Sequence, residues 1–268
     1  MSVSALKLLG LCSMLFDHVY HIFPELSFRL PDPLRFLWLY FGRLAAPIFL
    51  YSLVSGFRHT GDRSRYAFRL LGFALFSQLP YLLFFRAEDH RHGLPLSGFG
   101  DVGGNILFTL ALGLGMLALV ERFGEKNRPL AVLGVAGCMV LARVLDFEGR
   151  EGYLLIILSL YLLTDGKQRP RWAEVSLLLL TALLGRWRLL TMFADPRMRP
   201  SILLNTLGPF LGLCLALFGC NGEKGRGSLL GKWGMYLFYP LHLLALGALG
   251  MAMPPRLWYY TDHAQWMR

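Results

Sequence analysis

Asp17, His18 and His21 interrupt the first apolar run of the chain. A histidine beside a carboxylate is a typical general base, because imidazole titrates near neutral pH and the carboxylate raises its basicity. A charged group at mid-membrane depth costs about 2.5–3.5 kcal/mol, so it normally faces a partner or a wet cavity. We therefore expect Asp17 and His18 to form the chemical centre. The alternative is that Asp17 neutralises an arginine such as Arg43 for purely structural reasons.

Arg43 and His242 are the next candidates, because each lies near a proline inside an apolar run. Arg43 precedes a proline by four residues, and His242 follows one by two. A proline within a helix frees backbone carbonyls that a cavity can use, and small residues beside it let helices approach closely. We expect Arg43 to hold a carboxylate, an oxyanion or Asp17. His242 either lines the site or is a satisfied structural group.

The elements that position these residues belong in a bilayer. Of 268 residues, 55% are hydrophobic and only 16% are charged, whereas soluble domains carry about 25% charged residues. The sequence predicts an all-α, polytopic transmembrane bundle that forms one membrane domain over residues 1–268. Nine apolar runs are the expected helices: Ala5 to Phe23, Phe36 to Phe57, Tyr66 to Phe85, Asn105 to Val120, Leu130 to Leu145, Tyr153 to Thr164, Trp172 to about Leu190, Ile202 to Phe218 and Trp233 to Met253.

Lysine placement favours nine crossings of the cell membrane with a cytoplasmic N-terminus. In that topology every lysine falls on the cytoplasmic side, as the positive-inside bias requires. Eight crossings are the alternative, because the sixth run is shorter than the roughly 20 residues that a spanning helix needs. The five lysines are Lys7, Lys126, Lys167, Lys224 and Lys232.

This topology places His18 and Arg43 together in the outer half of the membrane, since a helix rises about 1.5 Å per residue. Polar residues of later runs fall toward the same side, and an acidic loop near Asp146 is suited to receive an amine. We expect a polar pocket that opens outward. Its candidate substrate-binding residues are Gln78, Asn105, Thr109, Asp146, Tyr239 and His242.

A strongly basic segment joins the second and third runs on the opposite, cytoplasmic side. Guanidinium groups match phosphate oxygens bidentately, so this segment is a candidate site for a nucleotide-bearing cofactor. The alternative is a basic loop that only sets topology. The candidate cofactor-binding residues are Arg58, His59, Arg63, Arg65 and Arg69.

Other classes of function lack support in the sequence. The net charge of +10 comes from loops between apolar runs, where basic residues set topology and meet lipid headgroups, so we expect membrane lipid and no nucleic acid as a partner. The spacing of the four cysteines matches no metal site, and we expect no metal. A transporter or channel with a path through Asp17, Arg43 and His242 is the competing interpretation, although no internal repeat accompanies it.

Ordered segments along most of the chain resemble the TraX family. The most specific are Asp17-His18, Gly42-Arg43, Arg58-His59-Thr60 and Asn105-x-x-Phe-Thr, followed by Tyr239-Pro240 with His242. That family is named for the integral membrane protein that acetylates the amino terminus of F-type conjugative pilin. The resemblance implies an acetyltransferase with acetyl-CoA as donor and an acceptor at the outer face, either a protein N-terminus, a glycan or a lipid.

Together, the resemblance and the expected depths suggest one mechanism. His18, oriented by Asp17, takes a proton from an attacking amine or hydroxyl, while the basic segment holds the phosphates of coenzyme A. Arg43, Gln78 or Asn105 stabilises the developing oxyanion, a role worth about 2.7–4 kcal/mol for one donor. An acetyl-histidine intermediate on His18 is the alternative, since histidine also acts as a nucleophile. The sequence leaves N- versus O-acylation, the acyl-chain length and a homo-oligomer open.

Overall fold

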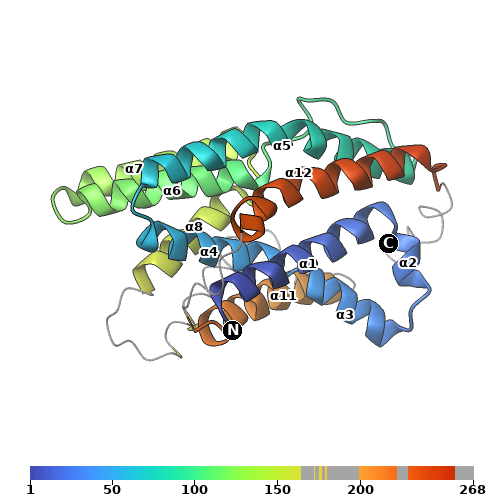
Figure 1. Cartoon of the computed structure of the whole chain (residues 1–268), viewed down its shortest axis with the longest axis horizontal. Coiled ribbons are helices and arrows are strands. Elements are labelled where there is room, and N and C mark those ends of the chain that lie inside the picture. Colours follow the sequence, from blue (N-terminus) through green and yellow to red (C-terminus); the bar gives the residue numbers. More distant parts are fainter. Residues whose placement is uncertain (164–171, 173–174, 177–178, 180–198, 222–228, 257–268) are drawn as a thin grey trace. The chain divides into compact units, whose positions relative to one another are not determined.

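The apolar runs fold into helices because lipid offers the backbone no hydrogen-bond partner, so each segment must satisfy its own polar groups. A computed structural model describes residues 1–163, 172, 175–176, 179, 199–221 and 229–256 of the chain. Every element in these residues is helical (Figure 1). The predicted all-α class is therefore confirmed for the part of the chain that the structure describes.

Five helical segments in the described residues are long and apolar enough to cross a membrane. They are α1 (Val3–Ile22), α3 (Asp32–Gly42) together with α4 (Ala45–His59), α5 (Arg63–His92), α6 (Ile106–Phe123), and residues Trp233–Ala252 of α12 (Leu229–Ala252). A multi-pass membrane protein follows from this composition and length.

The remaining apolar runs correspond to shorter apolar helices, or they lie outside the residues that the structure describes. Helix α7 spans Arg128–Val144 and α8 spans Arg150–Leu163, with 17 and 14 residues. Helix α11 (Arg199–Phe218) contributes the apolar stretch Leu207–Phe218. Most of the predicted seventh run, from Trp172 to about Leu190, lies outside the described residues.

The second apolar run forms two helices where the sequence predicted one helix kinked at a proline. Helix α3 ends at Gly42 and α4 begins at Ala45, so the break falls at Arg43 and Leu44. Pro47 lies in the first turn of α4, where a missing N–H costs no helical hydrogen bond. The irregular backbone therefore surrounds Arg43.

The third helix is longer than predicted, because α5 continues to His92. Gly93 then adopts a left-handed φ of 68°. Its N–H donates to His90 O (3.1 Å) and the Leu94 N–H donates to Asp89 O (2.8 Å), which is the Schellman pattern of a helix C-terminus. His90 and His92 therefore belong to the helix, beyond the predicted end of the run at Phe85, and Glu88 lies inside the helix.

The chain groups into two compact units. The first contains residues 1–48, 77–102 and 187–268, and the second contains residues 49–76 and 103–186. In the first unit α1 contacts α2 (Pro24–Phe28), α3 and α12, and α11 contacts α3 (Figure 1). In the second, α6 packs against α7 and α8. Helices α4 and α5 each run from one unit into the other.

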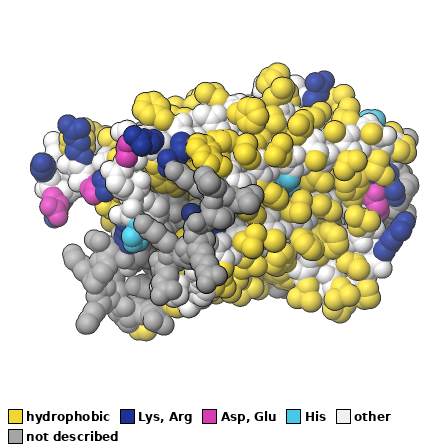
Figure 2. All heavy atoms as spheres, in the orientation of Figure 1, with side chains coloured by type: hydrophobic (Ala, Val, Ile, Leu, Met, Phe, Trp, Pro, Cys, Tyr) yellow, Lys and Arg dark blue, Asp and Glu magenta, His cyan; other side chains and the backbone are white. Residues whose placement is uncertain are grey.

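The outer surface of the first unit matches a lipid environment. Figure 2 shows hydrophobic side chains gathered over α12, α1 and α3. On α12 the exposed large side chains follow helical spacing, at Trp233, Leu237, Leu241 and Leu244, as one face of a helix against lipid requires. The polar residues of these helices therefore need partners within the protein.

Candidate functional site

Helices α1 and α3 approach closely where α3 ends. The Ser13 hydroxyl lies 2.6 Å from Phe41 O and 3.0 Å from Gly42 O, and so ties α1 to carbonyl oxygens at the C-terminal end of α3. A Cβ on Gly42 would lie 2.9 Å from Asp17 Oδ1, which is closer than such contacts normally occur. The absence of a side chain at Gly42 therefore lets Asp17 lie against the end of α3.

Arg43 is the partner of Asp17 at this junction. Arg43 Nε lies 3.6 Å from Asp17 Oδ1, within ion-pair range but beyond a normal hydrogen bond. This Nε atom is buried and has no hydrogen-bond partner among the described residues. Helix α11 also packs closely here, since a Cβ on Gly208 would lie 2.5 Å from Arg43 Cβ. The packing therefore leaves a buried N–H donor that an anionic group of a ligand can use.

His21 extends the cluster from α1 to α5. Its Nδ1 donates to Glu88 Oε1 at 2.7 Å, and its Nε2 lies 3.8 Å from Asp17 Oδ2. Asp17 thus has Arg43 at one carboxylate oxygen and His21 at the other. Glu88, His21, Asp17 and Arg43 form a continuous chain of ionisable side chains, which we call the acid–base chain.

His18 faces α12 and pairs with His242. His18 Nδ1 lies 2.7 Å from His242 Nε2, and the two ring planes are 6° apart. His242 Nδ1 in turn lies 2.7 Å from the backbone oxygen of Phe238. Pro240 lies in the same turn of α12, two residues before His242.

These two hydrogen bonds fix the tautomers of both neutral rings. A carbonyl oxygen only accepts, so His242 Nδ1 carries a hydrogen and His242 Nε2 has the lone pair. His242 Nε2 then accepts from His18 Nδ1–H. The hydrogen of His18 is therefore on Nδ1, and His18 Nε2 is an unprotonated nitrogen available as a base.

The predicted catalytic residues form different pairs in the structure from those expected in the mechanism that the sequence suggested. His18 was expected to be oriented by Asp17, but the Asp17 carboxylate contacts Arg43 and His21, and His18 pairs with His242. Tyr239 is buried, with its ring 5.8 Å from that of His242. Gln78 is a partly buried residue of α5 in the same unit.

Three predicted substrate-binding residues belong to the second unit and bond to the protein itself. Asn105 caps α6 by accepting from Leu107 N (3.1 Å) and donates to Ala74 O (2.8 Å). Thr109 Oγ1 donates to Glu148 O (2.6 Å). These contacts hold the start of α6 and the loop after α7 in place.

Asp146 lies in that loop and accepts from Arg150 Nε at 2.5 Å. Asp146 and Arg150 both have left-handed φ angles, 50° and 47°, which are uncommon for residues other than glycine. The same loop packs against Gly103, whose lack of a side chain leaves room for the Asp146 carbonyl. The loop is therefore closely fitted to the segment that precedes α6.

The basic segment between α4 and α5 offers fewer open guanidinium groups than its sequence suggests. Arg63 forms a bidentate pair with Glu121 of α6. Arg65 Nε lies 3.3 Å from Asp62 Oδ2, and Arg58 Nη2 donates to Tyr161 O (2.5 Å). A phosphate that bound these residues would have to compete with the present acceptors.

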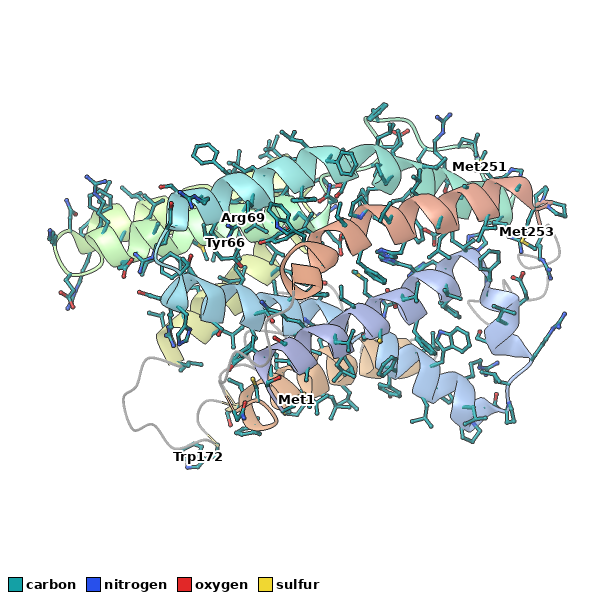
Figure 3. All side chains as sticks on the ribbon, in the orientation of Figure 1. Met1, Tyr66, Arg69, Trp172, Met251 and Met253 are labelled. Atoms are coloured by element: carbon teal, nitrogen blue, oxygen red, sulfur yellow. The ribbon has the colours of Figure 1, made fainter. Side chains whose placement is uncertain are left out.

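Arg69 and His59 complete the basic segment. Figure 3 shows Arg69 and Tyr66 near the start of α5, with the Arg69 guanidinium 5.8 Å from the Tyr66 ring centroid. Arg69 Nε is buried and has no hydrogen-bond partner among the described residues. His59 is exposed and donates from Nδ1 to Ser55 O (2.7 Å). Arg69 therefore provides the orphaned donor that best fits a phosphate or carbonyl oxygen.

Glu88 contacts the candidate site residue His21, but it was not among the residues that the sequence singled out. Residues 86–92 are mostly charged or histidine, and this composition suggested that the helix ended at Phe85. A helical signal was present in the spacing of Tyr81, Phe84 and Glu88, which lie three and four residues apart and so share one face.

Comparisons with known proteins agree over nearly the whole chain. The model of a family described as "TraX protein" matches residues 2–250. A curated relative, the "Probable fimbrial assembly protein FimC, serogroup H1" of Dichelobacter nodosus, is 30% identical over 250 residues. The match covers 91% of this chain and 94% of the relative. No solved structure matches the chain.

Proposed function

The chain belongs to the TraX family, and from this premise we propose that it is an integral membrane acetyltransferase. The proposed reaction moves an acetyl group from cytoplasmic acetyl-CoA to an amine or hydroxyl acceptor at the outer face of the membrane. The observation that carries the proposal is the hydrogen bond between His18 and His242, which leaves His18 Nε2 unprotonated. An ionisable side chain within an apolar helix costs free energy, so its presence favours a functional role for His18.

His18 acts as the general base in this proposal. Its Nε2 takes the proton from the acceptor as the acceptor nitrogen or oxygen bonds to the thioester carbonyl carbon. The carbon–sulfur bond then breaks, and the same proton goes from His18 to the departing sulfur. His242 stabilises the protonated ring of His18, because its Nε2 keeps accepting the Nδ1–H. General base catalysis of this kind contributes about 10²–10⁴ in rate.

Arg43 supplies the electrostatic part of the mechanism. Its buried Nε–H has no hydrogen-bond partner among the described residues, and negative charge develops on the carbonyl oxygen during the attack. An oriented donor at such an oxygen is worth about 2.7–4 kcal/mol. The Asp17 carboxylate, 3.6 Å away, keeps the guanidinium in place without occupying it with a short hydrogen bond.

The basic segment is the proposed binding site for the donor. When bound, acetyl-CoA supplies the activated thioester carbonyl. Arg69, with its orphaned Nε, is the residue best prepared to hold an oxygen of the donor. The residues that carry competing protein contacts, Arg58, Arg63 and Arg65, and the exposed His59 complete the proposed set.

The acceptor class is proposed from the comparisons. Acetylation of a pilin amino terminus is the activity for which the family is named, and the relative is named as a probable fimbrial assembly protein. We therefore propose the amino terminus of a surface-fibre subunit as the first acceptor to test, with a glycan or lipid hydroxyl as the alternative. The topology that suits this reaction has nine crossings of the cell membrane and a cytoplasmic N-terminus.

Vesicles with the cytoplasmic face outward test the proposal. Acetyl-labelled acetyl-CoA is added outside, and label in membrane protein and lipid is measured for wild type and His18→Ala. The proposal requires incorporation that depends on His18. Equal labelling by the two proteins would contradict it.

A second function is favoured by one observation. The acid–base chain links Glu88, His21, Asp17 and Arg43 at membrane depth, and such series of ionisable groups occur in proton pathways. The same vesicles, loaded with a pH-sensitive dye, report this activity. Proton flux that is lost in Asp17→Asn, without acetyl transfer by wild type, would select the transporter.

A further inference from the structure

We infer that Glu88 and His21 are positioning residues of the proposed acetyl-transfer site. They hold Asp17 in the orientation that fixes Arg43, and they act through the acid–base chain without touching the substrate. The inference rests on the proposed function and deepens it. It assigns a role to a carboxylate in the part of α5 that extends beyond Phe85, where the sequence predicted the end of the run.

His21 is the centre of the inference, because each of its ring nitrogens faces a carboxylate. Nδ1 lies 2.7 Å from Glu88 Oε1, and Nε2 lies 3.8 Å from Asp17 Oδ2. Carboxylate oxygens only accept, so both nitrogens are best matched as N–H donors. This arrangement favours the positively charged ring, which attracts the Asp17 carboxylate.

The charges along the acid–base chain then balance. Glu88 and Asp17 carry two negative charges, and His21 and Arg43 carry two positive charges. All four side chains are partly buried, with exposed fractions between 18% and 31%. In such surroundings, removing one charge leaves its neighbour uncompensated. Neutralising Glu88 therefore weakens the positive charge on His21 and loosens the hold of His21 on Asp17.

The position of Glu88 is itself fixed by a second buried contact. Arg91, one turn further along α5, is 1% exposed and donates to Ile22 O at the end of α1 (3.2 Å). It also donates to Glu25 Oε1 (2.6 Å) and to Pro254 O after α12 (2.6 Å). Arg91 therefore ties α5 to the last residue of α1, next to His21.

Asp17 consequently has a defined orientation. Its Oδ2 points to His21 and its Oδ1 to Arg43, while Gly42 leaves the space that the carboxylate fills. An Asp17 released by His21 would be able to turn and form a short bond to Arg43 Nε, occupying the donor that the reaction needs. The positioning role is thus to keep the Arg43 Nε–H open.

The test compares Glu88→Gln and His21→Gln with wild type in detergent. Acetyl-CoA hydrolysis gives kcat, calorimetry gives the Kd for acetyl-CoA, and nitrogen NMR of labelled histidine reports the protonation of each ring. Glu88→Gln keeps the shape of the side chain and removes its charge. Arg86→Gln, an exposed change on the same helix, is the matched control.

We expect Glu88→Gln to lower kcat about 10- to 100-fold, the loss seen when the hydrogen-bond partner of a metal-binding histidine is removed, without changing the Kd for acetyl-CoA. The NMR signal of His21 should change from a doubly protonated to a neutral ring, while the His18 signal keeps its Nδ1–H. Glu88→Asp should recover part of kcat, and the double variant Glu88→Gln with His21→Gln should lose no more than either single variant.

Two results overturn the inference and can be told apart. If wild type hydrolyses acetyl-CoA and Glu88→Gln keeps the wild-type kcat, Glu88 is only structural and the proposed function stands. If folded wild type neither binds nor hydrolyses acetyl-CoA, the proposed function fails and the positioning role fails with it.

Discussion

His18 Nδ1 and His242 Nε2 lie 2.7 Å apart, although 224 residues separate them in the chain. The pair joins the first and last described helices of the first unit. Because the Phe238 carbonyl fixes the hydrogen of His242 on Nδ1, one hydrogen bond to the backbone of α12 determines which nitrogen of His18 is free to act. The proposed reaction therefore depends on α12 as much as on α1.

Substitution of His242 is expected to impair turnover more than binding. His242→Phe keeps an aromatic ring next to Phe238 but removes the acceptor for His18 Nδ1–H. We expect kcat for acetyl-CoA hydrolysis to fall about 10- to 100-fold in both His242→Phe and His242→Ala, the range known for loss of the partner that orients a metal-binding histidine. Wild-type kcat in His242→Phe would mean that ring packing alone matters at this position.

Gly42→Ala is expected to disturb the site through Asp17. The new Cβ would lie 2.9 Å from Asp17 Oδ1 and 3.2 Å from Asp17 Cα, so α1 and α3 must move apart. Overpacking of this kind costs about 1–3 kcal/mol, and Arg43 should lose its fixed orientation. Thermal unfolding in detergent and kcat are the measurements.

Gly72→Ala is the matched control for this prediction. Gly72 also lies within a helix, but a Cβ there meets nothing within 4 Å, and alanine is favoured over glycine in a helix by about 0.5–1 kcal/mol. The prediction requires Gly72→Ala to unfold at the wild-type temperature or above it. Equal losses in the two variants would point to a general intolerance of alanine.

We expect Arg91 to contribute more to the stability of the folded protein than any other charged residue near the site. Breaking a buried ion pair by removing one partner costs about 3–5 kcal/mol, and Arg91 also bonds to backbone oxygens of Ile22 and Pro254. Arg91→Met should therefore lower the unfolding temperature far more than Arg86→Met, an exposed change on the same helix. Similar unfolding temperatures for the two variants would show that the Glu25–Arg91 pair contributes little.

Arg63 and Glu121 offer a direct test of the basic segment. The two residues form a bidentate pair, so a phosphate must compete with Glu121 for the guanidinium. If Arg63 holds the donor, Arg63→Gln should raise the Kd for acetyl-CoA roughly 10- to 100-fold, since charge-assisted hydrogen bonds contribute about 1.5–3 kcal/mol. Glu121→Gln should lower that Kd. An increase in Kd for both variants would instead indicate that the pair is needed only for structure.

The sequence predicted the helical class, and it singled out several residues of the candidate site, because both inferences depend on local composition. Asp17, His18, Arg43 and His242 were identifiable since polar residues are rare and costly in apolar runs. Their pairing was not identifiable, because it depends on which helices pack together. Only the packing of α1 against α12 brings His18 to His242, and only the small Gly42 lets Asp17 reach Arg43.

Glu88 was not identified from the sequence for a different physical reason. A charged stretch after an apolar run usually marks the end of a membrane helix, so the sequence predicted that the third run ends at Phe85. In the structure the buried Arg91 side chain finds acceptors on three neighbouring segments, and these contacts allow α5 to continue. Such compensation comes from residues far away in the chain and leaves no local pattern.

The central claim is that acetyl-CoA is the donor and that His18 performs the chemistry. The most direct measurement is calorimetric titration of acetyl-CoA into purified wild type and His18→Ala, followed by hydrolysis assays on the same samples. We predict saturable binding of equal affinity in both proteins and turnover in wild type alone. Absence of binding to well-folded wild type, or undiminished turnover in His18→Ala, would contradict the claim.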